Sequence, residues 1–217
     1  MDQSEEHFDT LRNNMVENQI IARGVKDPLV IKAMRTVPRH LFIPKDDAAY
    51  AYLDEPRPIG EGQTISQPYI VAFMTEQLHL KPEDHVLEIG TGSGYQAAVL
   101  AQIVDSVYTI EIIPELAQKA KAVISELHYD NVVVIEGDGY NGWPKNAPYD
   151  GIIVTAAPSK IPPPLLEQLK DGGRMVLPVG EYVQELVVVN KSESGISMEN
   201  VLPVRFVPMT GKIQENE

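Results

Sequence analysis

The sequence of 217 residues contains no cysteine. This absence excludes disulfide bonds, thiolate metal ligands and cysteine nucleophiles, and with them the cysteine-dependent route to cytosine methylation. Long apolar runs are also missing, since no segment approaches the roughly 20 residues that a membrane-spanning helix needs. The N-terminus lacks the apolar core of a signal peptide. We therefore expect a cytoplasmic chain that makes no membrane contact.

Positive charge is scarce, with 18 lysines and arginines against 31 acidic residues and a net charge of -13. Nucleic-acid binding usually shows as a basic patch, and the basic residues here are scattered, so no nucleic-acid partner is expected. The histidines show no paired spacing typical of metal sites. We interpret them as structural or solvated and expect no metal; they are His7, His40, His79, His85 and His128.

The most informative stretch runs from His85 to Ala101. It begins as an apolar run of strand character, breaks at Gly90, Gly92 and Gly94, and resumes at Tyr95 with helical composition. A strand, a glycine turn and a helix in this order form the first unit of a nucleotide-binding βαβ fold. Glycines allow the turn and a close approach of ligand to the main chain, and the helix would direct its unpaired N–H groups toward that ligand.

Two residues of this stretch decide between nucleotides. The dinucleotide fingerprint needs a small residue at its third conserved position, where this chain has the bulky Tyr95. Glu88 ends the strand, and its carboxylate suits an ammonium group better than a pyrophosphate. The pattern E-x-G-x-G-x-G is typical of binding S-adenosylmethionine, whose methionine end carries an amine. The alternative is a glycine turn in an α/β protein that binds no cofactor.

Two further acids lie at the ends of the next two expected strands. Glu111 is the last residue of Ser106–Glu111, and Asp138 comes shortly after Val132–Ile135. Glu111 lies close to the spacing at which an acid binds ribose hydroxyls in this fold, and a carboxylate can accept from two adjacent hydroxyls. Asp138 is placed to contact the adenine amino group. Either acid alone is more typical of a turn, but at successive strand ends they predict one site with the glycine turn.

The remaining pattern predicts a doubly wound, mostly parallel α/β sheet of Rossmann-like methyltransferase type, with a helical N-terminal cap and a β-rich C-terminal extension. Residues 1–80 would form a cap that is not independent, and residues 81–217 the cofactor-binding core with its extension. Expected helices cover 2–24, 28–36, 68–78, 114–127 and 162–168. Expected strands cover 149–154, 174–179, 185–190 and 201–206.

The stretch from Pro58 to Tyr69 is the second candidate for function. Two glycines and two hydroxyl residues precede Pro68, which suits the first turn of a helix. Ser66 or Gln67 would then lie at the start of that helix. Composition alone favours Ser66 as a simple helix cap, although loops of this kind often carry function.

Several stretches together resemble the protein-L-isoaspartate O-methyltransferase family over roughly residues 10 to 211. They are residues 57–60, 63–68, 86–95, 111–116, 137–139, 153–158 and 172–176. The resemblance implies methyl transfer from S-adenosylmethionine, leaving S-adenosylhomocysteine, to the free α-carboxylate of L-isoaspartyl residues in damaged proteins and peptides. The ester then collapses to a succinimide that can reopen as aspartate, so the activity is protein repair. We expect a monomer.

The resemblance also implies roles for single residues. Ser66 matches the active-site serine, and the implied substrate-binding residues are Ile59, Gln63, Thr64 and Val204. The implied cofactor contacts are Glu88, Gly90, Thr91, Gly92, Ser93, Glu111, Ile112, Asp138, Gly139 and, more weakly, Thr210. Residues 204–210 look like the segment that closes over the site.

Three rival functions stay open from the residues alone. The nearest is a methyltransferase for a small molecule or another protein group. The second is a catalytically silent module that binds S-adenosylmethionine and acts through protein contacts. A nicotinamide oxidoreductase is more distant, because Tyr95 and Glu88 depart from its fingerprint.

Overall fold

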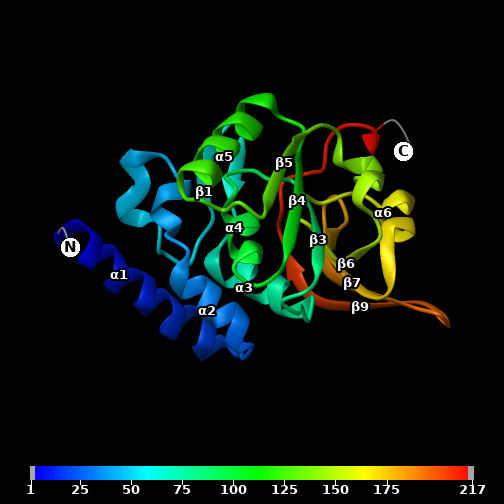
Figure 1. Cartoon of the computed structure of the whole chain (residues 1–217), viewed down its shortest axis with the longest axis horizontal. Coiled ribbons are helices and arrows are strands. Elements are labelled where there is room, and N and C mark those ends of the chain that lie inside the picture. The colour runs from blue at the N-terminus through cyan, green and yellow to red at the C-terminus, as the bar shows by residue number, and fades with distance from the viewer. Residues whose placement is uncertain (1–2, 215–217) are drawn as a thin grey trace.

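The computed structural model describes residues 3–214, and its central sheet has seven strands in the order β5-β4-β3-β6-β7-β8-β9. Strands β5, β4, β3, β6 and β7 are parallel to one another, whereas β8 pairs antiparallel with β7 and β9 pairs antiparallel with β8 at one edge (Figure 1). This confirms the doubly wound, mostly parallel fold with a β-rich C-terminal extension. The strands are β3 (His85–Ile89), β4 (Ser106–Glu111), β5 (Val132–Glu136), β6 (Tyr149–Val154), β7 (Leu169–Val179), β8 (Gln184–Ser192) and β9 (Gly195–Val204).

Both faces of the sheet are buried, which explains its near-continuous apolar strands. Alternate residues point to opposite faces, so Val86 and Ile153 belong to one apolar core and Leu87 and Ile152 to the other. The first core packs against α3 (Pro68–Gln77), α4 (Tyr95–Ala101) and α5 (Pro114–Glu126). The second packs against α6 (Pro163–Gln168), which lies on the opposite side of the sheet (Figure 1).

Residues N-terminal to the sheet form the helical cap. Its helices are α1 (Gln3–Met15), η1 (Val16–Ile20), η2 (Ile21–Arg23), α2 (Pro28–Thr36), η3 (Arg39–Phe42) and η4 (Lys45–Tyr50). The expected helix over 2–24 is thus α1 continued by two short turns that end at left-handed Gly24, and Asp2 lies outside the described residues. Buried cap residues from Met15 to Leu80 share one core with the sheet, which supports our proposal that the cap does not fold alone.

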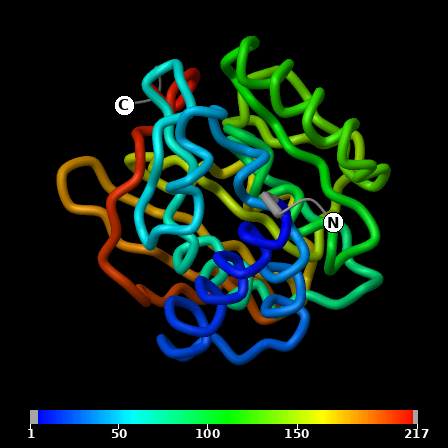
Figure 2. Tube along the Cα trace, turned by 90° about the vertical axis from the view of Figure 1, so that its left-hand side faces the viewer, coloured from blue at the N-terminus to red at the C-terminus, as the bar shows by residue number. Residues whose placement is uncertain are grey.

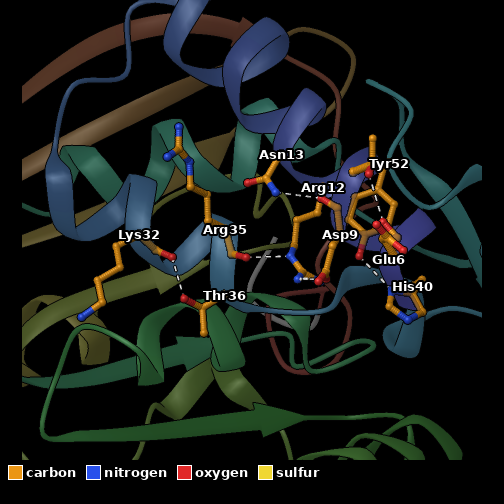
Figure 3. A network of polar contacts seen from close by, with 10 residues as sticks. Glu6, Asp9, Arg12, Asn13, Lys32, Arg35, Thr36, His40 and Tyr52 are labelled. Atoms are coloured by element: carbon orange, nitrogen blue, oxygen red, sulfur yellow. Dashed lines mark hydrogen bonds and ion pairs between the residues drawn. The ribbon is translucent and has the colours of Figure 1, made fainter. Parts of the chain in front are cut away.

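Polar contacts fasten α1 to the rest of the cap (Figure 3). The Arg12 side chain pairs with Asp9 and donates from Nε to the Arg35 carbonyl at 2.6 Å, linking α1 to α2. Behind it, His40 Nδ1 lies 2.8 Å from the Tyr52 hydroxyl. The first contact joins α1 to α2, and the second joins η3 to the segment that leads into the Ser66 loop.

Three details differ from the sequence-based expectation. Residues 57–65 contain an antiparallel pair, β1 (Arg57–Gly60) with β2 (Gln63–Ile65), that the pattern did not predict. Strand β7 begins at Leu169 rather than 174, because 170–173 form an irregular extension beside β6 where glycines permit the bend. Strand β9 covers 195–204 rather than 201–206, since its exposed residues 195–200 pair with β8 along an edge that faces solvent.

After β9 the chain returns toward the loop that holds Ser66. In Figure 2 the C-terminal segment, in red, runs beside the cyan segment that contains the β1–β2 pair, and residues from both segments line one pocket. Among residues 3–214, no helix combines the length and apolar character needed to cross a bilayer.

Candidate functional site

The glycine turn between β3 and α4 forms the floor of a pocket at the carboxyl ends of the parallel strands. Gly90 has φ of +92°, a left-handed conformation that side chains rarely adopt. A Cβ there would meet Thr155 Oγ1 at 2.5 Å, because that hydroxyl donates to the Gly90 carbonyl at 2.6 Å. Gly139 closes another side, where a Cβ would lie 2.3 Å from Ile89. Main chain therefore forms much of this surface.

Gly90→Ala should destabilise the fold by about 2–3 kcal/mol, from the left-handed conformation and the clash with Thr155. It should also weaken cofactor binding. Gly172→Ala is the matched control, since Gly172 has a similar φ of +86° but open space around its Cβ position, and we expect a cost of only about 1 kcal/mol there. Urea unfolding and calorimetric titration with S-adenosylhomocysteine measure both effects. Equal losses of stability in the two variants would contradict the role assigned to the Thr155 contact.

Glu88 lines this pocket from the end of β3 and is 0% exposed. Neither carboxylate oxygen has a hydrogen-bond partner among the described residues. Burial raises the pKa of Glu88 to about 8, with a smaller lowering by Thr109 and a further raising by Glu111. A buried, unpartnered carboxylate is costly when ionised unless a cation pairs with it. The pocket therefore fits a ligand that brings an ammonium group.

Glu111 holds the glycine turn in place from the end of β4. Its Oε2 accepts from the Gly92 N–H at 2.8 Å, and its Oε1 accepts from the Ile113 N–H at 3.0 Å. Each carboxylate oxygen can accept a second hydrogen bond, so both stay available to adjacent ribose hydroxyls. On the inner side of the turn, the Thr91 and Thr109 hydroxyls lie 2.6 Å apart.

The C-terminal segment covers the same pocket. Residues 207–210 line it, and the segment is bonded to Ala157 on both sides: the Ala157 N–H donates to the Val207 carbonyl and the Met209 N–H to the Ala157 carbonyl, each at 2.8 Å. Further along, the Lys212 N–H donates to Asp138 Oδ2 at 2.8 Å. Asp138 Oδ1 accepts from the Tyr140 N–H. The side chain of Asp138 thus fastens the segment that closes over the pocket.

A second pocket adjoins the first beside the Ser66 loop. Its lining includes Gln67, Ile70 and residues 203–207. Arg205 is the only charged residue that lines it in the described part of the chain. Both pockets share the same four lining residues, Thr64, Ser66, Thr155 and Val207. Ser66 therefore lies where a molecule bound in the first pocket would meet a molecule bound in the second.

Ser66 does not cap the helix that follows it, so that interpretation was wrong. Gln67 occupies the N-cap position of α3, and no side chain accepts from the first turn. Pro68 supplies the first helical residue and needs no partner for a missing N–H. Ser66 therefore has no capping role, and the residue lines both pockets.

The structure gathers most of the predicted site residues, although their roles stay predictions. The first pocket is lined by Gln63, Thr64, Ser66, Glu88, Gly90, Thr91, Gly92, Ser93, Glu111, Ile112, Gly139 and Thr210, and Val204 lines the second. Ile59 lines neither; it is buried against Gly92 from β1. Asp138 lies just outside the lining. Sequence reasoning missed Thr155, whose signal was its position directly after β6.

The fold and this site together indicate the class of protein. A Rossmann-like sheet with an acid-tipped first strand, a glycine turn and acids at the next strand ends is that of S-adenosylmethionine-dependent methyltransferases. The family model described as protein-L-isoaspartate(D-aspartate) O-methyltransferase matches residues 10–214. The chain belongs to that family.

Individual relatives agree with the family model. The chain is 55% identical over 201 residues to the protein-L-isoaspartate O-methyltransferase of Picosynechococcus, covering 93% of this chain and 90% of the relative. It is 55% identical over 202 residues to the protein of that name from Methanoregula boonei, covering 93% of each. Among solved structures, a putative Plasmodium falciparum enzyme of this type in complex with S-adenosyl-L-homocysteine has a TM-score of 0.81 at 27% identity, covering 92% of this chain and 98% of that one.

Proposed function

We propose that this chain transfers a methyl group from S-adenosylmethionine to the free α-carboxylate of L-isoaspartyl residues in damaged proteins and peptides. Family membership over residues 10–214 supports the reaction. The observation that carries it in the structure is the pair of adjoining pockets that meet at Ser66. One pocket is lined by Glu88, a buried carboxylate without a counter-cation, and the other is lined by the cation Arg205 and, in the described part of the chain, by no acid.

The first pocket would hold the cofactor through its own polar groups. Glu88 would pair with the ammonium group, Glu111 with the ribose hydroxyls, and the glycine turn would lie against the ligand. When bound, S-adenosylmethionine supplies a methyl group on a positively charged sulfur, and S-adenosylhomocysteine is left after transfer. The C-terminal segment over this pocket would exclude water, which strengthens electrostatic interactions inside it.

The second pocket would hold the carboxylate without any need for a general base. An α-carboxyl group has a pKa near 3.3–3.7, so it is ionised at neutral pH. Accordingly, no histidine lines either pocket in the described part of the chain. The remaining task is alignment, which can contribute roughly 7–11 kcal/mol. Ser66 would donate a hydrogen bond that orients the carboxylate, and the N-terminal end of α3 beside it favours negative charge.

An isoaspartyl peptide and the same peptide with normal aspartate test this function directly. We expect release of S-adenosylhomocysteine and a base-labile methyl ester with the first peptide and neither with the second. Product release with other acceptors alone would favour a different methyltransferase. Cofactor binding without turnover on any peptide would favour a silent binding module.

A further inference from the structure

Arg39 is a fully buried cation beside the Ser66 loop, with 0% of its surface exposed. It begins η3 in the cap, and its Nε donates to the Ala51 carbonyl at 2.7 Å. Its Nη2 donates to the carbonyl of Ser66 at 2.8 Å. The guanidinium also lies 4.8 Å from the ring centroid of Tyr95, the first residue of α4 after the glycine turn. One side chain thus connects the cap, the Ser66 loop and the cofactor turn.

A buried arginine that served only to fill space would cost free energy of folding. A buried guanidinium loses its hydration, and the Arg39 hydrogen bonds to Ala51 and Ser66 go to neutral carbonyl oxygens rather than to a carboxylate. Its Nη1 has no acceptor among the described residues. Burial lowers the pKa of Arg39 to about 10, which still leaves it charged at neutral pH. Apolar residues of similar volume often stabilise such positions as well or better.

The contact with Ser66 has a geometric consequence. The peptide group between Ser66 and Gln67 is planar, with its C=O and N–H on opposite sides. Because Arg39 holds the C=O toward the core, the N–H of Gln67 is directed the other way. Both residues line the second pocket. A rotation of this peptide group would therefore move the hydroxyl-bearing residue and the adjacent N–H together.

We propose that Arg39 is a positioning residue of the methyl transfer: it holds the Ser66 carbonyl inward and so fixes the Ser66 hydroxyl and the Gln67 N–H against the carboxylate pocket. It touches neither pocket, and it acts through the Ser66 main chain. This inference rests on the proposed function and adds a residue that lies 27 positions before the serine it positions.

Turnover separates positioning from simple stabilisation. Arg39→Met should lower kcat on an isoaspartyl peptide by about 10-fold to 30-fold, as expected for a displaced contact group, while the Kd for S-adenosylhomocysteine changes less than about 3-fold. In a Ser66→Ala background the same substitution should lower kcat by a smaller factor than in the unaltered protein, because the hydroxyl is gone and only the Gln67 N–H remains to be positioned. Arg39→Lys, which keeps the charge but cannot span both carbonyls, should fold well and still lose turnover.

Lys191→Met is the matched control, since Lys191 Nζ also donates to two carbonyls, those of Leu166 and Leu169, away from both pockets. It should lower stability without lowering kcat. Equal kcat losses for Arg39→Met with and without Ser66, or full turnover in Arg39→Lys, would overturn the proposal.

Hydrogen exchange gives a readout that does not need activity. In Arg39→Met and Arg39→Lys the Val71 N–H, which donates to the Gln67 carbonyl at 3.1 Å, should exchange faster, and in Lys191→Met it should not. Unchanged exchange would sink the positioning role. Should the unaltered protein fail to methylate the peptide, the proposed function fails, and the exchange result still decides whether Arg39 holds the loop.

Discussion

Glu88→Gln is expected to weaken binding of S-adenosylhomocysteine about 100-fold, which corresponds to about 2.7 kcal/mol. Glutamine keeps the size and loses the charge that would pair with the ligand's ammonium group. Neither Glu88 oxygen has a hydrogen-bond partner within the described chain, so an ammonium group of the ligand would supply the counter-charge for the buried carboxylate. Removing one side of a buried charged pair is correspondingly costly.

The proton balance gives this prediction a second measurement. Because the pKa of Glu88 is raised to about 8, the ligand-free carboxyl is mostly protonated at pH 7. Pairing with an ammonium group requires the ionised form, so binding should release nearly one proton. Calorimetry at pH 7 in two buffers of different ionisation enthalpy counts that proton. Glu88→Gln should release none.

The same shift sets the sign of a stability effect. Between pH 4.5 and about 8 the folded state holds a proton on Glu88 that the unfolded state has lost. This group's contribution therefore makes the ligand-free fold less stable as pH rises through that window, and Glu88→Gln should remove the dependence. The control is Glu136→Gln, at the exposed end of β5 and outside both pockets. If Glu88→Gln binds S-adenosylhomocysteine within about 3-fold of the unaltered protein and releases the same number of protons, the role of Glu88 is refuted.

The first half of the sheet was predictable because its signals are local. Apolar runs predicted β3, β4 and β6 at their observed bounds, and Tyr95–Ala101 is the observed α4. Parallel strands place their carboxyl ends on one edge, so Glu88 and Glu111 come together without further information. Composition and spacing therefore predicted that the glycine turn and these two acids line one pocket, and their contacts with a cofactor stay predictions.

What the sequence could not predict depends on contacts between distant segments. Tyr95 marked only a departure from the dinucleotide fingerprint, whereas in the structure it is 1% exposed and packs edge-on against Phe42 of the cap, with ring centroids 5.6 Å apart. Arg39 belongs to none of the motifs that the sequence offers, and only the fold brings it to the Ser66 carbonyl. No local periodicity encodes such tertiary partners.

The role of Asp138 shows the same limit from another side. Its position after β5 suggested a contact with adenine, but its two oxygens accept from the Tyr140 and Lys212 N–H groups. Each oxygen can accept a second hydrogen bond, and the contact with adenine stays a prediction. The bond to Lys212 spans 74 residues, and that separation hides it from any motif.

Ser66→Ala should lower kcat on an isoaspartyl peptide by at least about 100-fold, because a 1 Å loss of alignment in such a reaction can cost that much. The Kd for S-adenosylhomocysteine should stay within about 2-fold, since Ser66 makes no contact that shapes the glycine turn. Rapid-mix turnover assays and calorimetry separate these two quantities. The shape of the pH profile should not change, because no proton is removed by Ser66 in a reaction whose nucleophile is already ionised.

Ser93→Ala is the matched control, because it removes a serine hydroxyl from the cofactor pocket alone. Ser93 lines the cofactor pocket but not the carboxylate pocket, and its Oγ accepts from the Tyr95 N–H at 3.3 Å. It should raise the Kd for the cofactor by a few-fold and leave kcat nearly unchanged. The opposite pattern, with Ser66→Ala weakening cofactor binding as much as turnover, would mean that the serine serves the donor pocket. Thr155, which also lines both pockets, would then replace Ser66 as the residue expected to orient the carboxylate.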